Sequence, residues 1–331
     1  MKDVCVIGGS GFIGTRLVNR LRTQNNFYVK IIDKVTSNVH GDLVTLCDVR
    51  SIQQLNRSIC EKSVIINLAA EHRDDVRPLS LYDEVNVDGA RNICNIAREK
   101  GVQSIIFTSS VAVYGFAPIG TDESGKIAPF NDYGRTKYDA EQVFKTWQAE
   151  ASKERTLVII RPTVVFGEQN RGNVYNLLRQ IASGKFVMIG SGENRKSMAY
   201  VENIAAFIEY SMGFKPGVHI YNFIDKPDFT MNKLVGSVKR ILGQTEKISL
   251  RLPFALGYSI GKGFDLVAAI TGKRLAISSI RVKKFCANSV YNTAIDETGF
   301  VAPVPLAKAL EQTIRHEFIE THVDEPLYFS E

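Results

Sequence analysis

The chain has 331 residues, of which 44% are hydrophobic and 23% charged, and its net charge is +6. This is globular composition with ample material for a core, and the mild positive charge suits an anionic ligand or membrane surface without indicating a nucleic-acid partner. The sequence shows no signal peptide, no apolar run of spanning length, and no zinc-ligand spacing among its five cysteines. We therefore expect a cytoplasmic protein with reduced thiols and no metal site.

The first 17 residues carry the clearest motif. An apolar run at 2–7 predicts a strand, and a glycine-rich loop then leads into a helix. Gly8 permits the tight turn, Gly11 leaves room for a pyrophosphate, and Gly14 lets helix and strand pack closely. The pyrophosphate would lie at the helix N-terminus, where unpaired N–H groups and the helix dipole favour anions. This order of strand, glycines and helix predicts a dinucleotide-binding site.

A second strand, predicted at 28–32, ends at Asp33. That position lies about 20 residues after the last glycine, where a ribose-binding acid is expected. A carboxylate there would accept hydrogen bonds from both ribose hydroxyls and repel a 2′-phosphate. The sequence therefore predicts NAD, not NADP, as the cofactor.

Strands continue to alternate with helices after Asp33. Further strands are expected at 44–47, 63–68, 105–107 and 156–160, and helices at 51–60, 83–100 and 133–153. The alternation predicts an α/β fold, a Rossmann-type doubly wound parallel sheet whose ligand crevice lies at the carboxyl ends of the strands. Residues expected at those ends include Ala69, Ala70, Ser109, Ser110 and Arg161.

The rhythm changes after Pro162, which suggests two parts. We expect a NAD-binding domain at 1–165, with its sheet completed by about 195–225 through a helix at 200–212 and a strand at 219–223. The remainder, 166–194 and 226–331, is expected to form a smaller substrate-binding lobe. That lobe should contain a helix at 173–183 and a strand at 186–189.

The helix expected at 133–153 opens with two chemically active side chains. Tyr133 and Lys137 are four residues apart and therefore share one helix face. A free phenol ionises at about pH 10, but a nearby ammonium and a positively charged nicotinamide would stabilise the phenolate. Ser110, at the end of the strand at 105–107, can orient the same substrate hydroxyl. We predict these three as catalytic residues, with Tyr133 as the general base.

These motifs, with the stretches 68–70, 108–115 and 161–162, resemble the extended short-chain dehydrogenases/reductases, which include nucleotide-sugar epimerases and dehydratases. The resemblance implies that Tyr133 is the base, that Lys137 holds the ribose and tunes Tyr133, and that Ser110 positions the substrate. It also implies an adenine contact at Asp48 and Val49 and a homodimer. The full set of expected cofactor contacts is Gly8, Gly11, Phe12, Ile13, Gly14, Asp33, Asp48, Val49, Leu68, Ala69, Ala70, Ser109, Tyr133, Lys137, Arg161 and Pro162.

A narrower resemblance covers nearly the whole chain. The stretches 71–76, 170–178, 196–201, 281–287 and 299–303 are similar to bacterial 4-epimerases of undecaprenyl-diphosphate-linked N-acetylglucosamine. Those enzymes make the N-acetylgalactosamine lipid that starts some O-antigen repeats. The resemblance implies epimerisation through a 4-keto sugar without net redox change. The Arg-Asp pair common in the larger family is missing at 194–201, and Arg195 and Lys196 can take its place. The expected substrate contacts are Ser110, Asn173, Arg195 and Lys196.

Alternatives stay open at this point. The carrier of the sugar can be UDP instead of a lipid, and a 4-keto-sugar reductase would use the same residues while consuming a reduced cofactor. A dehydratase is disfavoured, because Val111 and Ala112 follow Ser110 where an acidic pair is usual. A non-catalytic NAD-binding protein is also disfavoured, since it has no need of a base.

The stretch 252–284 has two interpretations. Dense apolar residues at 252–270, broken by glycines, are followed by the basic residues Lys273, Arg274, Arg281, Lys283 and Lys284. This pattern fits an amphipathic surface on an anionic membrane leaflet, which would place the protein on the inner face of the cell membrane. It equally fits a core helix of the smaller lobe with a solvated basic flank.

Overall fold

The computed structural model describes residues 1–73, 76–248, 250–271 and 278–329. Within these ranges, seven parallel strands form a central sheet in the order β10-β6-β5-β4-β1-β2-β3. This confirms the predicted doubly wound α/β fold. The strands are β1 (Lys2–Ile7), β2 (Phe27–Asp33), β3 (Val44–Leu46), β4 (Val64–Asn67), β5 (Ser104–Thr108), β6 (Thr156–Pro162) and β10 (Gly217–Phe223).

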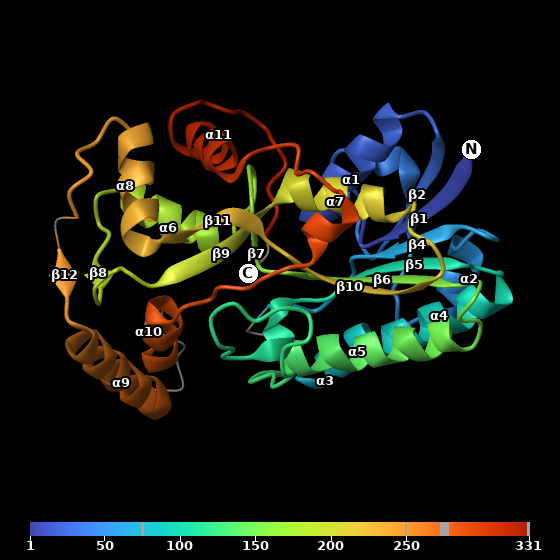
Figure 1. Cartoon of the computed structure of the whole chain (residues 1–331), viewed down its shortest axis with the longest axis horizontal. Coiled ribbons are helices and arrows are strands. Elements are labelled where there is room, and N and C mark those ends of the chain that lie inside the picture. The colour runs from blue at the N-terminus through green and yellow to red at the C-terminus, as the bar shows by residue number, and fades with distance from the viewer. Residues whose placement is uncertain (74–75, 249, 272–277, 330–331) are drawn as a thin grey trace.

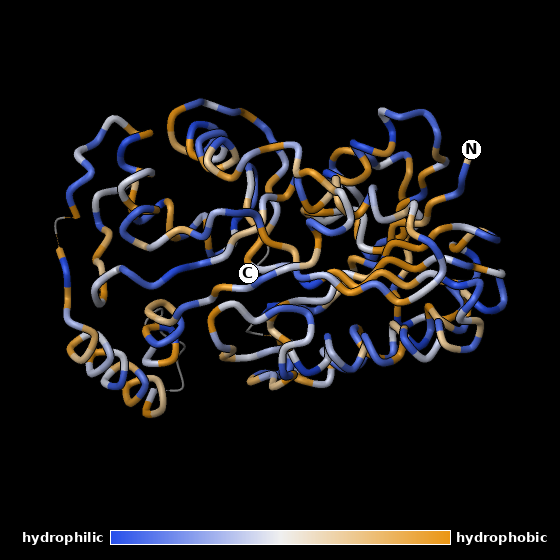
Figure 2. Tube along the Cα trace, viewed as in Figure 1, coloured by the Kyte–Doolittle hydropathy of each residue, from blue (hydrophilic) through white to orange (hydrophobic). Residues whose placement is uncertain are grey.

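Helices cover both faces of this sheet, as Figure 1 shows. Figure 2 shows hydrophobic residues running along the central strands, which is expected where both faces are buried. One face is covered by α1 (Phe12–Thr23) and α7 (Val201–Ser211), and the other by α2 (Ile52–Ser58), α4 (Gly89–Glu99) and α5 (Asp132–Ala149).

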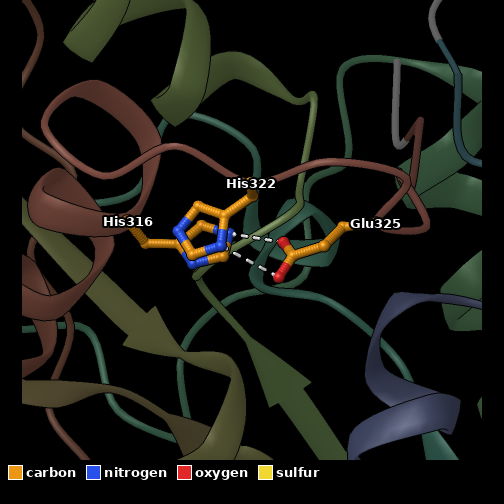
Figure 3. A group of neighbouring side chains, drawn as sticks. All are labelled: His316, His322 and Glu325. Carbon is orange, nitrogen blue, oxygen red and sulfur yellow. Dashed lines mark ion pairs between the residues drawn. The ribbon is translucent and has the colours of Figure 1, made fainter.

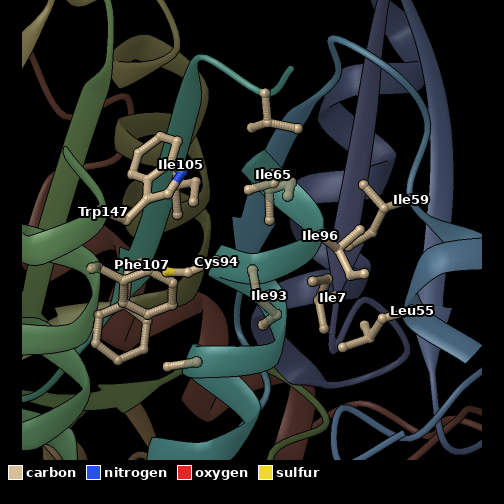
Figure 4. Packing of buried hydrophobic residues seen from close by; sticks show 14 of the residues in the cluster. Ile7, Leu55, Ile59, Ile65, Ile93, Cys94, Ile96, Ile105, Phe107 and Trp147 are labelled. Carbon is tan, nitrogen blue, oxygen red and sulfur yellow. The ribbon is translucent and has the colours of Figure 1, made fainter. Parts of the chain in front are cut away.

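The core under α5 fixes the helix that carries Tyr133 and Lys137. Trp147 and Phe144 of α5 are fully buried, and the Phe144 ring lies 4.8 Å from that of Phe107 on β5. Figure 4 shows Trp147 and Phe107 packing beside Cys94 of α4. Burying such large side chains stabilises the contact by roughly 1.5–3 kcal/mol each. The later turns of α5 are therefore held firmly against the sheet.

The helix predicted at 83–100 differs from the expectation in its first turns. It begins as a short helix, α3 (Ser80–Tyr82), and continues through a π-helical segment, η2 (Asp83–Asp88), into α4. The wider π-helical turn carries Asn86, which is buried and bonds to the backbone of Glu71. Such turns frequently occur at functional sites.

A second region lies beside the central sheet (Figure 1). In the described residues its strands form a three-stranded sheet, β11-β9-β7, and a two-stranded one, β12-β8. β9 was not predicted as a strand, and it belongs to the smaller sheet although 195–225 was expected to complete the large one. The division into a NAD-binding and a substrate-binding part stays a prediction. The strands are β7 (Val164–Phe166), β8 (Met188–Ile189), β9 (Arg195–Tyr200), β11 (Asp225–Thr230) and β12 (Arg251–Leu252).

The helices of this region pack mainly on the small sheets. α6, α8 and α11 share a hydrophobic core with β7, β8 and β9, whereas α9 and α10 lie at one end of the molecule (Figure 1). Among the described residues, no helix is long and apolar enough to cross a membrane. The helices are α6 (Asn173–Ala182), α8 (Met231–Ile241), α9 (Phe254–Thr271), α10 (Ser279–Cys286) and α11 (Leu306–Phe318), and short 3-10 turns are η1 (Gly41–Leu43), η3 (Val111–Tyr114) and η4 (Ile295–Thr298).

Candidate active site

The glycine loop between β1 and α1 requires residues without side chains. Gly8 has φ +78°, and a Cβ there would lie 2.7 Å from the backbone nitrogen of Ala69. A Cβ on Gly14 would lie 2.6 Å from Cα of Gly9, so the helix packs directly on the loop. Gly11 is the N-cap of α1, and no described side chain caps that end of the helix. The free N–H groups of the first turn are therefore suited to an anion.

Asp33 lies where the sequence predicts a ribose-binding acid, at the end of β2. Its two carboxylate oxygens accept hydrogen bonds from the backbone N–H groups of Ser10 (3.0 Å) and Val35 (3.2 Å). These bonds join the carboxylate to the glycine loop and leave lone pairs for ligand hydroxyls. Together with the side-chain-free surface at Gly11, this donor and acceptor set fits NAD.

Asp48 and Val49, expected at the adenine, have partners within the protein. Asp48 is bound by the guanidinium of Arg50, with a shortest distance of 2.7 Å, and this hydrogen bond holds the pKa of the carboxyl below its usual range. Val49 is buried, and its carbonyl accepts from Asn92 at 3.0 Å. The adenine contact stays a prediction.

Tyr133, Ser110 and Lys137 are brought together by the junction of β5 and α5. Ser110 precedes η3, and a hydrogen bond joins its side chain to the Tyr133 phenol. Lys137 is buried, donates from Nζ to the carbonyl of Thr108 at 2.7 Å, and lies 4.7 Å from the centre of the Phe107 ring. The end of β5 thus positions both Ser110 and Lys137.

Burial dominates the electrostatics of this trio. It raises the pKa of Tyr133 above its usual value, while the hydrogen bond with Ser110 lowers it. Burial also lowers the pKa of Lys137 to about 7, although the charge of Glu141 opposes this. The expected stabilisation of the phenolate by the ammonium together with a positively charged nicotinamide stays a prediction.

Gly134 was missed by the sequence interpretation, although it lies between the two helix residues singled out there. A Cβ on Gly134 would lie 2.5 Å from the carbonyl oxygen of Ala112 in η3. The helix is capped by Asn131, whose side chain accepts from the Gly134 N–H at 2.9 Å. This close approach brings Tyr133 to Ser110. The glycine directly after the tyrosine was the available signal.

Asn86 was also missed. Its side chain donates to the carbonyl of Glu71 and to Oγ1 of Thr136, both at 3.0 Å, and accepts from the Glu71 N–H at 2.9 Å. It therefore links the segment after β4 to the first turns of α5. No spacing in the sequence indicates this contact, because the three residues are far apart along the chain.

Arg161 and Ser109, expected at the cofactor, belong to a buried network. The guanidinium of Arg161 forms two hydrogen bonds with the carboxylate of Glu141 (2.8 and 2.6 Å), and Ser109 donates to the same carboxylate at 2.6 Å. Arg161 also donates to the hydroxyl of Tyr114, which in turn donates to Asn222. These contacts use Nε and both terminal nitrogens of the Arg161 guanidinium. Its direct role at the cofactor stays a prediction.

The remaining predicted cofactor residues lie after β4, at the end of β6 and in the first turn of α1. Leu68, Ala69 and Ala70 follow β4 beside Gly8, and Pro162 is buried at the end of β6. Ile13 packs in the core under α1. Phe12 opens α1, and its ring lies 5.8 Å from that of Tyr328 near the C-terminus.

The predicted substrate contacts lie on different elements. Asn173 is the first residue of α6, and Arg195 and Lys196 open β9. Arg195 is exposed, but Lys196 donates from Nζ to the carbonyls of Lys284 and Ala287, at 2.8 and 2.7 Å. Burial lowers the pKa of Lys196 to about 8. Lys196 thus joins β9 to the end of α10, and its substrate contact stays a prediction.

A model of the NAD dependent epimerase/dehydratase family matches residues 4–223. The chain belongs to this family. The match spans the whole central sheet, and the family description confirms the predictions of NAD and of an enzyme of this class.

Individual family members were also compared. The chain is 48% identical to the N-acetyl-alpha-D-glucosaminyl-diphospho-ditrans,octacis-undecaprenol 4-epimerase of Escherichia coli O157:H7, over 99% of each chain. It is 31% identical to a UDP-glucose 4-epimerase of Vibrio cholerae, over 82% of this chain and 86% of that one. A solved UDP-glucose 4-epimerase from Thermotoga maritima has the same fold, with TM-score 0.74 and 20% identity, covering 95% of this chain and 98% of that one. The resemblance stated from the sequence is confirmed.

Proposed function

We propose that this family member is a sugar 4-epimerase that interconverts N-acetylglucosamine and N-acetylgalactosamine on undecaprenyl diphosphate. The observation that carries the proposal is the 48% identity over 99% of both chains to the Escherichia coli enzyme of that name. The junction of Ser110, Tyr133 and Lys137 supplies the residue types that the reaction requires. The product would enter the synthesis of a surface polysaccharide such as an O-antigen.

The chain's own part in the reaction is the handling of one proton. Bound NAD, held by the glycine loop at Gly8, Gly11 and Gly14 and by Asp33, would supply hydride transfer from and to C4 of the sugar. Tyr133 takes the proton of the 4-hydroxyl and later gives it back, and Ser110 holds that hydroxyl against the phenol. Lys137 keeps two N–H donors beyond the one given to Thr108, and these are available for the ribose hydroxyls.

A lipid carrier requires the enzyme to work at a membrane surface. A polyprenyl chain leaves the bilayer only at a cost of about 0.8 kcal/mol per CH₂ group. The site must therefore approach the headgroups. We infer that α9 makes this approach, on the inner face of the cell membrane.

The exposure of α9 supports this inference. Gly257 and Gly261 are its buried residues, whereas large apolar side chains of the helix are exposed, up to 64% for Leu266 and 75% for Ile270. Figure 2 shows hydrophobic stretches along this helix, which lies at one end of the molecule. The exposed set is Phe254, Leu256, Ile260, Phe264, Leu266, Val267 and Ile270.

Basic residues connect α9 to the candidate active site. Lys283 and Lys284 of α10 lie about 5 Å above the rings of Phe116 and Phe130, in the segment that leads to Tyr133. Lys283 also lines a hollow of about 350 Å³ beside Phe254 of α9. This arrangement suits a lipid diphosphate whose tail runs toward α9. Lys273 and Arg274, named with this basic cluster from the sequence, lie outside the described residues.

The rival function is epimerisation of a nucleotide-linked sugar, which the 31% identity to the Vibrio cholerae UDP-glucose 4-epimerase favours. A direct comparison of substrates decides between them. The purified protein with NAD is given undecaprenyl-diphosphate-linked N-acetylglucosamine in vesicles or UDP-N-acetylglucosamine in solution, with Tyr133→Phe as the control. We expect rapid conversion of the lipid-linked sugar and little of the other. Efficient conversion of the UDP sugar alone would establish the rival. The homodimer stays a prediction.

A further inference from the structure

A cluster of potential metal ligands lies at the C-terminal end of the described chain, away from the three catalytic candidates in sequence. His316 is on the last turns of α11, and His322 and Glu325 follow on the segment 319–329, here called the C-terminal strap. One donor atom from each side chain lies within 4.8 Å of the other two. Figure 3 shows both imidazole rings turned toward the carboxylate of Glu325.

The distances show how closely these groups converge. Nε2 of His316 lies 3.0 Å from one oxygen of Glu325, and Nδ1 of His322 lies 3.1 Å from the other. The two rings are stacked, with centres 3.8 Å apart. The side-chain N–H of Gln169 also donates to the Glu325 carboxylate at 3.1 Å, which fixes its position beside the two rings.

The second nitrogen of His322 supplies an independent observation. Its Nε2 lies 3.3 Å from a carboxylate oxygen of Glu320, so both ring nitrogens face carboxylates. A neutral imidazole has one N–H and one lone pair, and it can donate to only one of them. If Nε2 carries the hydrogen and donates to Glu320, Nδ1 faces the anionic Glu325, and either a second ring proton or a cation between Nδ1 and Glu325 removes that repulsion. A carboxylate on the distal nitrogen is the usual support of a metal-binding histidine.

We propose that His316, His322 and Glu325 bind a divalent transition-metal ion of the zinc type, with Glu320 and Gln169 positioning His322 and Glu325. Two imidazoles and a carboxylate form a donor set that zinc accepts, with water as a fourth ligand. Binding requires the three donors to approach to about 2.0–2.2 Å from the ion. The strap residues His322 and Glu325 would make this adjustment. The proposal goes beyond the sequence expectation of no metal site and is independent of the proposed function.

The consequence of metal binding follows from what the strap touches. Tyr328 pairs with the segment at 169–171, and its hydroxyl lies 3.0 Å from Oγ1 of Thr15 on α1. Its ring packs on Phe12, the first residue of the helix that follows the glycine loop. A metal ion joining α11 to the strap would therefore stabilise the strap against the N-terminal turn of α1.

The test uses tag-free, full-length protein freed of metal by a chelator. It is titrated with Zn²⁺ by calorimetry and with Co²⁺ by visible absorption, and amide hydrogen exchange of 319–329 is measured with and without Zn²⁺. We expect one ion per chain, visible Co²⁺ bands from nitrogen and oxygen ligands, and slower exchange in the strap. Glu320→Gln should weaken binding by about 10–100-fold, the usual effect of losing such a support.

Variants at the ligands separate this site from unspecific metal uptake. His322→Ala and Glu325→Gln should each abolish the Co²⁺ bands and the protection of the strap. His219→Ala is the matched control, because His219 lies on β10 and contacts the carbonyl of Lys215. The His219→Ala protein should bind the metal ion as the unchanged protein does. Absence of binding, or equal affinity in His322→Ala, would show that the cluster is only a set of ion pairs and would overturn the proposal.

Discussion

The motif of Tyr133 and Lys137 predicted where the two side chains lie, but not the effect of burial on their pKa values. The spacing of Tyr133 and Lys137 predicted a shared helix face, and the structure places both at the end of β5. The sequence interpretation expected the ammonium and a positively charged nicotinamide together to lower the pKa of the phenol, and this stays a prediction. In the protein alone, burial raises the pKa of Tyr133 and lowers that of Lys137 to about 7. Burial depends on neighbours distant in the chain, which a local spacing does not contain.

This environment gives Ser110 a measurable role. Because its hydrogen bond lowers the pKa of Tyr133, Ser110→Ala should raise that pKa and move the acidic limb of the kcat profile to higher pH. Tyr133→Phe should lose about a hundredfold or more in kcat at every pH, the scale of losing a general base, while still binding NAD. The exposed Ser124→Ala serves as control. Superimposable pH profiles for Ser110→Ala and the unchanged protein would contradict this role.

At the scale of elements, β6 and α5 are joined by a buried ion pair. The side chains of Arg161 and Glu141 are 3% and 0% exposed, and two hydrogen bonds between them connect the end of β6 to α5. The sequence placed Arg161 correctly at a strand end, and its assignment to the cofactor stays a prediction. Glu141 follows Lys137 by four residues and Tyr133 by eight, so it shares their helix face. That spacing was the available signal for the pair.

Loss of one partner should expose the structural role of this pair. Arg161→Met leaves the buried Glu141 without its guanidinium partner, so we expect about 3–5 kcal/mol lower free energy of unfolding, measured in urea. In the double variant with Glu141→Leu, much of this loss should be recovered, since no uncompensated charge remains. An Arg161→Met protein of unchanged stability but weakened NAD affinity would instead support the predicted cofactor contact.

At the scale of the whole molecule, the central sheet was predictable and the second region was less so. Long apolar strands and helices gave the order of elements through 162 and the return to the sheet at β10. The short strands β7, β9 and β11 pair across long stretches of chain, and such pairing leaves little local pattern. For 252–284, the sequence left core and surface interpretations open. The exposed side chains of α9 favour the surface.

Membrane binding by α9 has a direct test. The protein should sediment with anionic vesicles, and this binding should weaken as salt is added. The double variant Leu266→Ser/Ile270→Ser should bind less. Gln substitution of Lys283 and Lys284 should cost roughly 1 kcal/mol per charge. Val301→Ser, an exposed apolar position outside α9, is the matched control. Absence of vesicle binding, or equal binding of the α9 variant and this control, would contradict a role of α9 in membrane binding.

The fate of the hydrogen at C4 distinguishes a 4-epimerase from a reductase. Undecaprenyl-diphosphate-linked N-acetylglucosamine carrying deuterium at C4 is incubated in vesicles with the purified protein and NAD, without a reductant. We expect N-acetylgalactosamine lipid that keeps the deuterium at C4, with no net formation of NADH. The reason is that the transferred deuteride would leave C4 and return to it within one site. No conversion, or a product whose C4 hydrogen comes from solvent or requires added reductant, would contradict the assignment of a 4-epimerase.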